Sequence, residues 1–119
     1  MGFQQGISGL NAASKNLDVI GNNIANSGTV GFKASRAEFA DLVANSMAGF
    51  SGGKNAGFGV EVATISQQFS QGVLNMTGND LDVAINGGGF FKLQLHDGSS
   101  AYTRAGNFKQ DKTGDIVTN

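Results

Sequence analysis

Few residues of this chain are suited to catalysis. His96 is its only histidine, and a histidine acting as a general base needs a nucleophile and an orienting partner within reach. Asp97 and Gly98 follow it directly, a combination typical of an exposed turn. The sequence therefore favours a turn at His96 over a catalytic role.

Two glycine clusters could be mistaken for phosphate-binding loops. Gly52-Gly53-Lys54 lacks the earlier glycine that a phosphate-binding loop requires, and Asn55 stands where Ser or Thr is needed. The cluster 87–89 lies between two predicted strands and does not open a helix, so it indicates a turn or a bulge. No cofactor is expected at either place.

The acidic residues do not form a recognisable metal motif. A calcium loop needs oxygen ligands at alternate positions and a closing glutamate. The aspartates depart from that pattern, and they are better interpreted as turn and surface residues: Asp80, Asp82, Asp97, Asp111 and Asp115. Paired catalytic carboxylates stay open, although nothing favours them. Because there is no cysteine, thiolate metal sites and disulfides are excluded. We expect no catalytic, cofactor-binding or metal-binding residues, and no enzymatic activity.

The composition also limits the kinds of partner. The chain has 119 residues, a formal net charge of −1 and no basic patch, so nucleic acid is not an expected partner. Its apolar runs are short, which argues against membrane insertion. The N-terminus has neither a basic region nor a long apolar stretch, so no cleaved signal peptide is expected.

The elements that would position these residues indicate an α+β chain. Residues 1–28 are predicted to hold an amphipathic helix, from Gly2 to about Asn26, with a near-heptad apolar stripe and a neighbouring stripe of small residues. The small residues would let another helix approach closely, and they would make a lone helix marginal. The proposed apolar anchors are Phe3, Ile7, Leu10, Leu17, Ile20 and Ile24.

The stripe has two interpretations. It could face the core of its own domain, or it could pack against other helices in an assembly. The second is favoured because the helix starts at a terminus, where ends fray unless docked, and because a Gly-rich stretch separates it from the strands. We therefore expect the helix to be ordered by assembly and not by folding onto the β portion.

The rest of the chain is predicted as an extended Gly-rich linker over residues 29–59, followed by a mostly-β and incomplete domain over residues 60–119. Within the linker, 34–47 has the pattern of a short helix. Strands are expected where apolar residues alternate, at 60–65, 81–85, 91–95, 101–104 and 116–118, with turns at 87–89, 96–98 and 112–115.

The opening segment begins with Phe-Gln-Gln-Gly-Ile-Ser-Gly-Leu-Asn-Ala-Ala at 3–13 and ends with Asn-Ile-Ala-Asn-Ser-Gly-Thr-Val-Gly-Phe at 23–32. It closely resembles the N-terminus of bacterial flagellar rod and hook proteins. Their shared signature is Asn, Ile or Leu, Ala, Asn, two residues, Thr, one residue, Gly and Phe. Residues 8–13 are more similar to the hook branch than to the distal rod branch. The signature falls on Asn23, Ile24, Ala25, Asn26, Thr29, Gly31 and Phe32. A second block, 77–91 with 102–111, resembles the first β-rich domain of the same family.

The resemblance implies a structural subunit of the flagellar hook. Such subunits form a helical homopolymer, a flexible hollow tube outside the cell whose N-terminal helix is half of a coiled coil. The implied partners are further copies, rod and hook–filament junction proteins, the hook cap and the export apparatus. Export without a cleaved signal is also implied, and the family's Phe-x-x-x-apolar export pattern fits Phe39 and Val43, as well as Phe3 and Ile7.

Two alternatives stay open at the level of sequence. One is a distal rod or hook-associated junction protein of the same machine. The other is a small ligand-binding β domain, which would need a pocket with convergent polar groups. The missing second heptad helix leads us to expect an N-terminal portion of a longer subunit.

Overall fold

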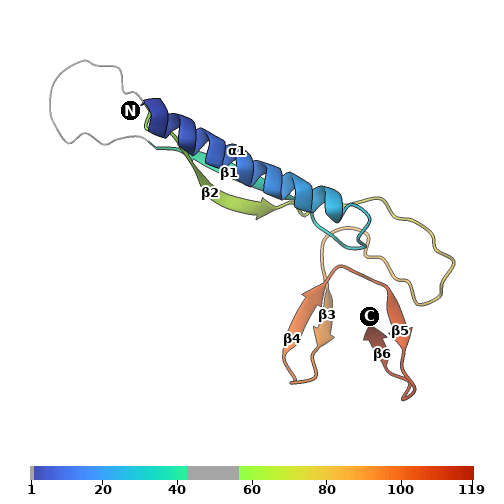
Figure 1. Ribbon diagram of the computed structural model, residues 1–119. Coiled ribbons are helices and arrows are strands. Elements are labelled where there is room, and N and C mark those ends of the chain that lie inside the picture. The colour runs from blue at the N-terminus through green and yellow to red at the C-terminus, as the bar shows by residue number, and fades with distance from the viewer. Residues whose placement is uncertain (1, 43–56) are drawn as a thin grey trace. The chain divides into compact units, whose positions relative to one another are not determined.

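The computed structural model describes residues 2–42 and 57–119 and divides into two compact units (Figure 1). The first unit comprises Met1–Ala25 and Ala34–Gln68, and the second comprises Asn26–Lys33 and Phe69–Asn119. This grouping differs from the expected one, because the first predicted strand of the 60–119 region belongs with the helix. The predicted mixture of one helix and several strands is confirmed.

The helix α1 spans Gly2–Ala25, within a residue or so of its predicted bounds. It ends in a turn, in which the Thr29 amide donates to the Asn26 carbonyl at 2.9 Å. Its first turn has no acidic residue and its last turn has no basic one, so charges do not stabilise the helix dipole. Packing must therefore contribute much of its stability.

Strands β1 (Ser35–Asp41) and β2 (Val60–Gln67) form an antiparallel pair with an irregularity between Glu38 and Phe39. The short helix predicted at 34–47 is wrong in its described part, which is the strand β1. Residues 43–56, which hold the rest of that prediction and three of the six glycines of the predicted linker, lie outside the described residues.

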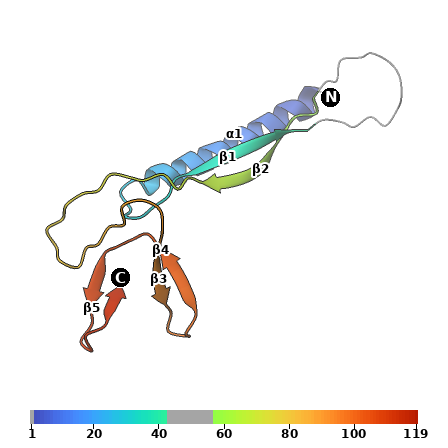
Figure 2. The ribbon, with the colours of Figure 1, turned by 180° about the vertical axis from the view of Figure 1, so that it is seen from behind.

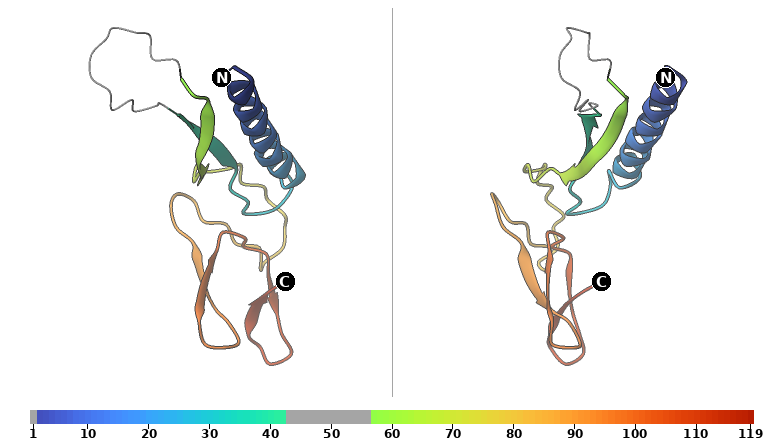
Figure 3. Two further views of the ribbon diagram at one scale, coloured as in Figure 1. Left: turned by 60° about the vertical axis from the view of Figure 1, so that its left-hand side comes forward. Right: turned by 90° about the vertical axis from the view of Figure 1, so that its left-hand side faces the viewer.

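The helix lies along one face of the β1–β2 pair, as seen from opposite sides in Figures 1 and 2 and from the side in Figure 3. The most buried apolar side chains described are at this contact: Ala12, Val19 and Ala37. We expected α1 to stand apart from the strands. The separation in sequence was misleading, because the hairpin folds back along the helix.

The second unit holds two hairpins. Strand β3 (Phe91–Gln94) pairs with β4 (Ser100–Thr103), and β5 (Phe108–Gln110) pairs with β6 (Ile116–Thr118). The predicted turns at 96–98 and 112–115 are confirmed, and 87–88 is a bend. The strand predicted at 81–85 is wrong in extent, because only Asp82 bridges to another residue. Strand β5 was not predicted.

Two pairs of aromatic rings pack within this unit. The rings of Phe91 and Phe108 meet edge to face at 5.1 Å, and those of Phe69 and Phe90 do so at 5.8 Å. Beside Phe91, the buried Gly106 accepts a hydrogen bond from the Val83 amide at 3.0 Å. The segment containing Val83 is therefore fixed to the start of β5.

Candidate assembly surface

The predicted apolar stripe of α1 is exposed along its whole length. Phe3, Leu10, Leu17 and Ile24 recur every seven residues and are exposed by 82%, 71%, 67% and 68%. The two flanking anchors, Ile7 and Ile20, are each 43% exposed. Side chains of this size are ordinarily buried, and a contiguous row of them marks an interaction surface.

The stripe and the hairpin occupy nearly opposite sides of the helix. The buried Ala12 and Val19 also lie seven residues apart, but each follows a stripe residue by two positions. At about 100° per residue, two positions rotate a side chain by about 200°. One face of α1 is therefore used inside the unit, while the apolar face is left for something else.

Small residues border the stripe. A Cβ atom added at Gly2, Gly6, Gly9 or Gly21 would meet no other atom within 4 Å, so the helix backbone is open to close approach there. The charged side chains of α1, Lys15 and Asp18, lie away from the stripe. The exposed face is thus uncharged and partly smooth, as close helix–helix packing requires.

Polar side chains anchor the opposite face of α1 to the hairpin. The Ser8 hydroxyl accepts a hydrogen bond from the Val60 amide at 3.0 Å, and Gln5 donates to the Gly57 carbonyl. Gly59 has a φ of +121°, and a Cβ at this position would collide with the Ser8 side chain. Glycine is therefore required where the strand β2 approaches the helix.

The Asn23 side chain forms the anchor at the other end. Its amide nitrogen donates to the Ser35 carbonyl at 2.7 Å, and its amide oxygen accepts from the Ser35 amide at 2.9 Å. This pairing imitates a strand neighbour and fixes the start of β1 to the last turn of α1. Asn23 belongs to the family signature, but this structural role could not be predicted from the sequence, because Ser35 lies twelve residues further along the chain.

The remaining signature residues build the turn after the helix. The Thr29 hydroxyl lies 3.3 Å from the Asn26 side-chain oxygen, and the Phe32 amide donates to the Thr29 carbonyl at 3.3 Å. Gly31 has a φ of +76°, and a Cβ there would lie 2.5 Å from the Ala105 backbone nitrogen. The signature therefore combines two structural demands: a specific turn and a close backbone contact that excludes side chains. Of the other two signature residues, Ile24 is in the stripe and Ala25 ends the helix.

Hollows flank the contact between Ala12 and the hairpin. The hollow beside β2 has a mixed lining, in which the charged Lys15 and Glu61 lie among apolar groups such as Leu42. The other is lined mainly by apolar groups, including Ala13 and Phe39. Phe39, the first residue of the predicted export motif, is 41% exposed in β1, and Val43 lies outside the described residues.

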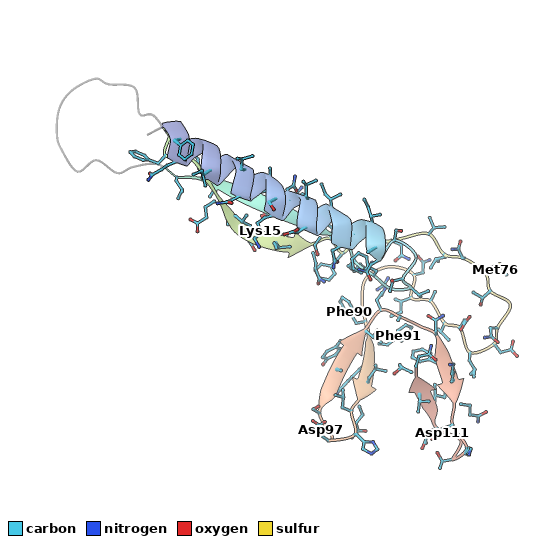
Figure 4. The ribbon with its side chains drawn as sticks, in the orientation of Figure 1. Lys15, Met76, Phe90, Phe91, Asp97 and Asp111 are labelled. Carbon is cyan, nitrogen blue, oxygen red and sulfur yellow. The ribbon has the colours of Figure 1, made fainter. Side chains whose placement is uncertain are left out.

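The histidine and the aspartates considered for catalysis lie mainly in and beside turns. His96 and Asp97 occupy the turn between β3 and β4, while Asp111 lies beside the turn between β5 and β6 (Figure 4). Hydrogen bonds from the Ser99 hydroxyl and amide lower the pKa of Asp97 below its ordinary value. In β1, hydrogen bonding to Arg36 at 2.8 Å lowers the pKa of Glu38. Asp97 is exposed and Glu38 is half-buried, and both carboxylates form local hydrogen bonds.

Residues 2–42 and 57–119 hold neither a cluster of metal ligands nor a membrane-spanning helix. This part of the chain contains no group of three acidic or histidine side chains that could hold a metal ion. It also contains no helix that is both long and apolar enough to cross a bilayer.

Comparison with known proteins identifies both ends of the chain. Residues 3–33 match the model of the flagella basal body rod protein family, and residues 84–119 match the flagellar hook protein FlgE/F/G D1 domain. The flagellar hook protein FlgE of Escherichia coli (strain K12) is 51% identical over 117 residues, which cover 98% of this chain. The chain belongs to the flagellar hook and rod protein family.

Other members of the family are nearly as similar. Flagellar hook protein FlgE of Salmonella typhimurium (strain LT2) is also 51% identical over 98% of this chain. Flagellar basal-body rod protein FlgG of Bacillus subtilis (strain 168) is 48% identical over 122 residues, which cover 95% of this chain. The chain spans 27% of the length of those hook proteins and 46% of that rod protein.

Proposed function

We propose that this chain is part of a structural subunit of the bacterial flagellar hook, a flexible hollow tube that couples the motor and rod to the filament. The strongest support is the uncharged heptad stripe of α1, which is exposed on the face turned away from the hairpin. The relatives are named as hook and rod proteins, which supports a structural role and not an enzymatic one.

The stripe supplies the driving force for assembly. Full burial of one Leu, Ile or Phe side chain contributes about 1.5–3 kcal/mol, so a row of such residues favours association strongly. The occupant we propose is another α-helix, from the same subunit or from neighbouring copies, in a coiled coil. Many moderate contacts of this kind suit a tube that bends, because neighbours can slide past one another.

The two hollows beside α1 suggest on which side the partner helix lies. The β1 side is mainly apolar at Ala13 and Phe39, whereas Lys15 and Glu61 line the β2 side. Burying those charges without partners would be costly. We therefore propose that the partner helix covers the stripe from the β1 side, where Ala13 permits close approach.

A rod protein of the same machine is the second candidate. It is favoured by the 48% identity to a FlgG rod protein and by the rod-family match at residues 3–33. The slightly higher identity to FlgE favours the hook. Immunolabelling of the subunit in purified hook–basal bodies would separate the two, because label on the curved hook supports our proposal and label confined to the rod supports the alternative.

The location and partners follow from the same proposal. A hook subunit would lie outside the cell, contact rod and junction proteins and the hook cap, and pass through the flagellar export apparatus without a cleaved signal. Phe39 and Val43 are the proposed export motif. The Phe39→Ala variant should then reduce secretion of the subunit, whereas the neighbouring exposed Ala40→Ser change should not.

The test of the proposed function is a charge placed on the stripe. The substitution Leu10→Asp should abolish hook assembly, because a carboxylate would be buried between apolar helices. Secretion should continue, since Leu10 is 71% exposed in the subunit. Hook length and number would be measured by electron microscopy, and secreted subunit by immunoblot of the culture supernatant.

The matched control is Asn11→Asp, which adds the same charge one residue further on, on an exposed polar face. This variant should build hooks. Normal hooks from Leu10→Asp subunits would contradict the proposed function.

A further inference from the structure

Asn86 and Gly87 form the one Asn-Gly pair of the sequence. This pair is chemically labile, because the glycine leaves its backbone nitrogen unshielded. That nitrogen can attack the asparagine Cγ and close a five-membered ring. Asn86 is exposed, and no hydrogen bond to its side chain is found within the described residues. Within the described part of the chain, neither burial nor a hydrogen bond therefore restrains the Asn86 side chain from reaching the geometry needed for attack.

The backbone on both sides of Asn86 is held firmly by other residues. The Arg104 guanidinium donates to the carbonyls of Ile85 (3.0 Å), Gly87 and Gly89. It also donates to the Gln71 side-chain oxygen at 2.8 Å, and that oxygen accepts the Gly87 amide at 3.3 Å. We call Arg104 and Gln71 the clamp. Charge-assisted hydrogen bonds of this kind are among the stronger ones in proteins.

The clamp acts on the group that would react. Attack requires the Gly87 nitrogen to lose its proton and turn toward the Asn86 Cγ. Its N–H is bonded to Gln71, and the carbonyls on either side are bonded to Arg104. Gly87 also has a φ of +100°, a conformation that glycine adopts readily. Reaction must therefore await local opening of the loop, which costs these hydrogen bonds.

We propose that Asn86 is a site of spontaneous deamidation whose rate is set by the Gln71–Arg104 clamp. The Gly87 nitrogen bonds to the Asn86 Cγ, the bond from Cγ to the side-chain nitrogen breaks, and ammonia leaves with the proton given up by Gly87. Water then opens the ring at either carbonyl and yields aspartate or isoaspartate. Isoaspartate lengthens the backbone within the clamped segment and so displaces the carbonyls that Arg104 binds.

The test is to incubate the whole chain at neutral pH and about 37 °C and to measure, by peptide mapping, how fast isoaspartate forms at residue 86. Folded protein should react about tenfold more slowly than the same chain in urea, the equivalent of about 1.4 kcal/mol. The variant Gln71→Ala should shift the folded rate toward the urea rate. The matched control is Gln68→Ala, an exposed glutamine outside the clamp, which should leave the rate unchanged.

Equal rates in the folded wild type and in urea would overturn the proposal, even if Gln71→Ala failed to fold. A correctly folded Gln71→Ala variant that reacts at the wild-type rate would also overturn it. Hydrogen exchange at the Gly87 amide provides the independent readout of clamp opening, and it should accelerate in this variant.

Discussion

Gly106 shows how one residue can decide the packing of the second unit. A Cβ atom there would lie 1.6 Å from the Val83 carbonyl oxygen and 3.3 Å from the Phe91 ring. The near collision is with backbone, which cannot rotate away. Glycine is therefore required by close approach of two chain segments, at a site where no positive φ demands it.

We predict that Gly106→Ala destabilises the chain by about 3 kcal/mol, at the upper end of overpacking effects, because the segment carrying Val83 must move. Urea unfolding followed by circular dichroism would measure the loss. Gly72→Ala is the control, since a Cβ there meets nothing within 4 Å, and it should change stability by less than about 0.5 kcal/mol. Comparable stability of the two variants would count against the packing described for Gly106.

Asp97 offers a second test at a single residue. The Ser99 hydroxyl and amide, at 2.6 and 2.9 Å, stabilise its charged form and lower its pKa. Since the folded pKa is lowered, the stabilisation is present above the ordinary aspartate pKa and is lost as pH falls through the folded value. Ser99→Ala should raise the Asp97 pKa toward its ordinary value, as measured by NMR titration. An unchanged pKa would show that the turn is held in another way.

At the scale of elements, the contact between α1 and the hairpin depends on Asn23. We predict that Asn23→Ala costs about 1–3 kcal/mol, because both backbone groups of Ser35 lose their partner. Hydrogen exchange at the Ser35 amide should accelerate in this variant. Asn16→Ala, also on α1 but exposed, should leave that exchange unchanged. Equal protection of Ser35 in both variants would contradict the role given to Asn23.

The helix could be predicted from sequence because its periodicity is long, and its bounds agree with the structure. Strand β1 could not be predicted. Its sequence contains Ala37, Glu38 and Ala40, which suit a helix, and pairing with β2 and packing on α1 override that preference. Strand β5 has only three residues, too few for a period to be seen.

The exposed stripe was also found from sequence, while the face that holds the hairpin was not. Ala12 and Val19 are the apolar residues of that face, and the other contacts are made by polar side chains such as Ser8 and Asn23. A helix face that binds through polar side chains shows no regular spacing of apolar residues, so the sequence pattern does not reveal it. Its side chains form hydrogen bonds with backbone groups of residues distant in sequence, which only the folded chain brings together.

At the scale of the whole molecule, the two units share a scarcity of buried apolar volume. Among the residues described, no large side chain is fully buried, and the apolar residues with the least exposure are two alanines and a valine. Two-stranded sheets are marginal by themselves in water. We therefore predict that association with further helices and strands contributes much of the stability in an assembled state.

The two faces of α1 have different uses: one holds the hairpin within the subunit, and we propose that the other is covered only on assembly. The chain has no cysteine, so a single introduced thiol reports on each face. The Leu17→Cys thiol should react with a maleimide probe in the isolated subunit and be protected in assembled hooks, whereas Val19→Cys should be protected in both. A Leu17→Cys thiol already protected in the isolated subunit, or equally reactive in the hook, would contradict the account.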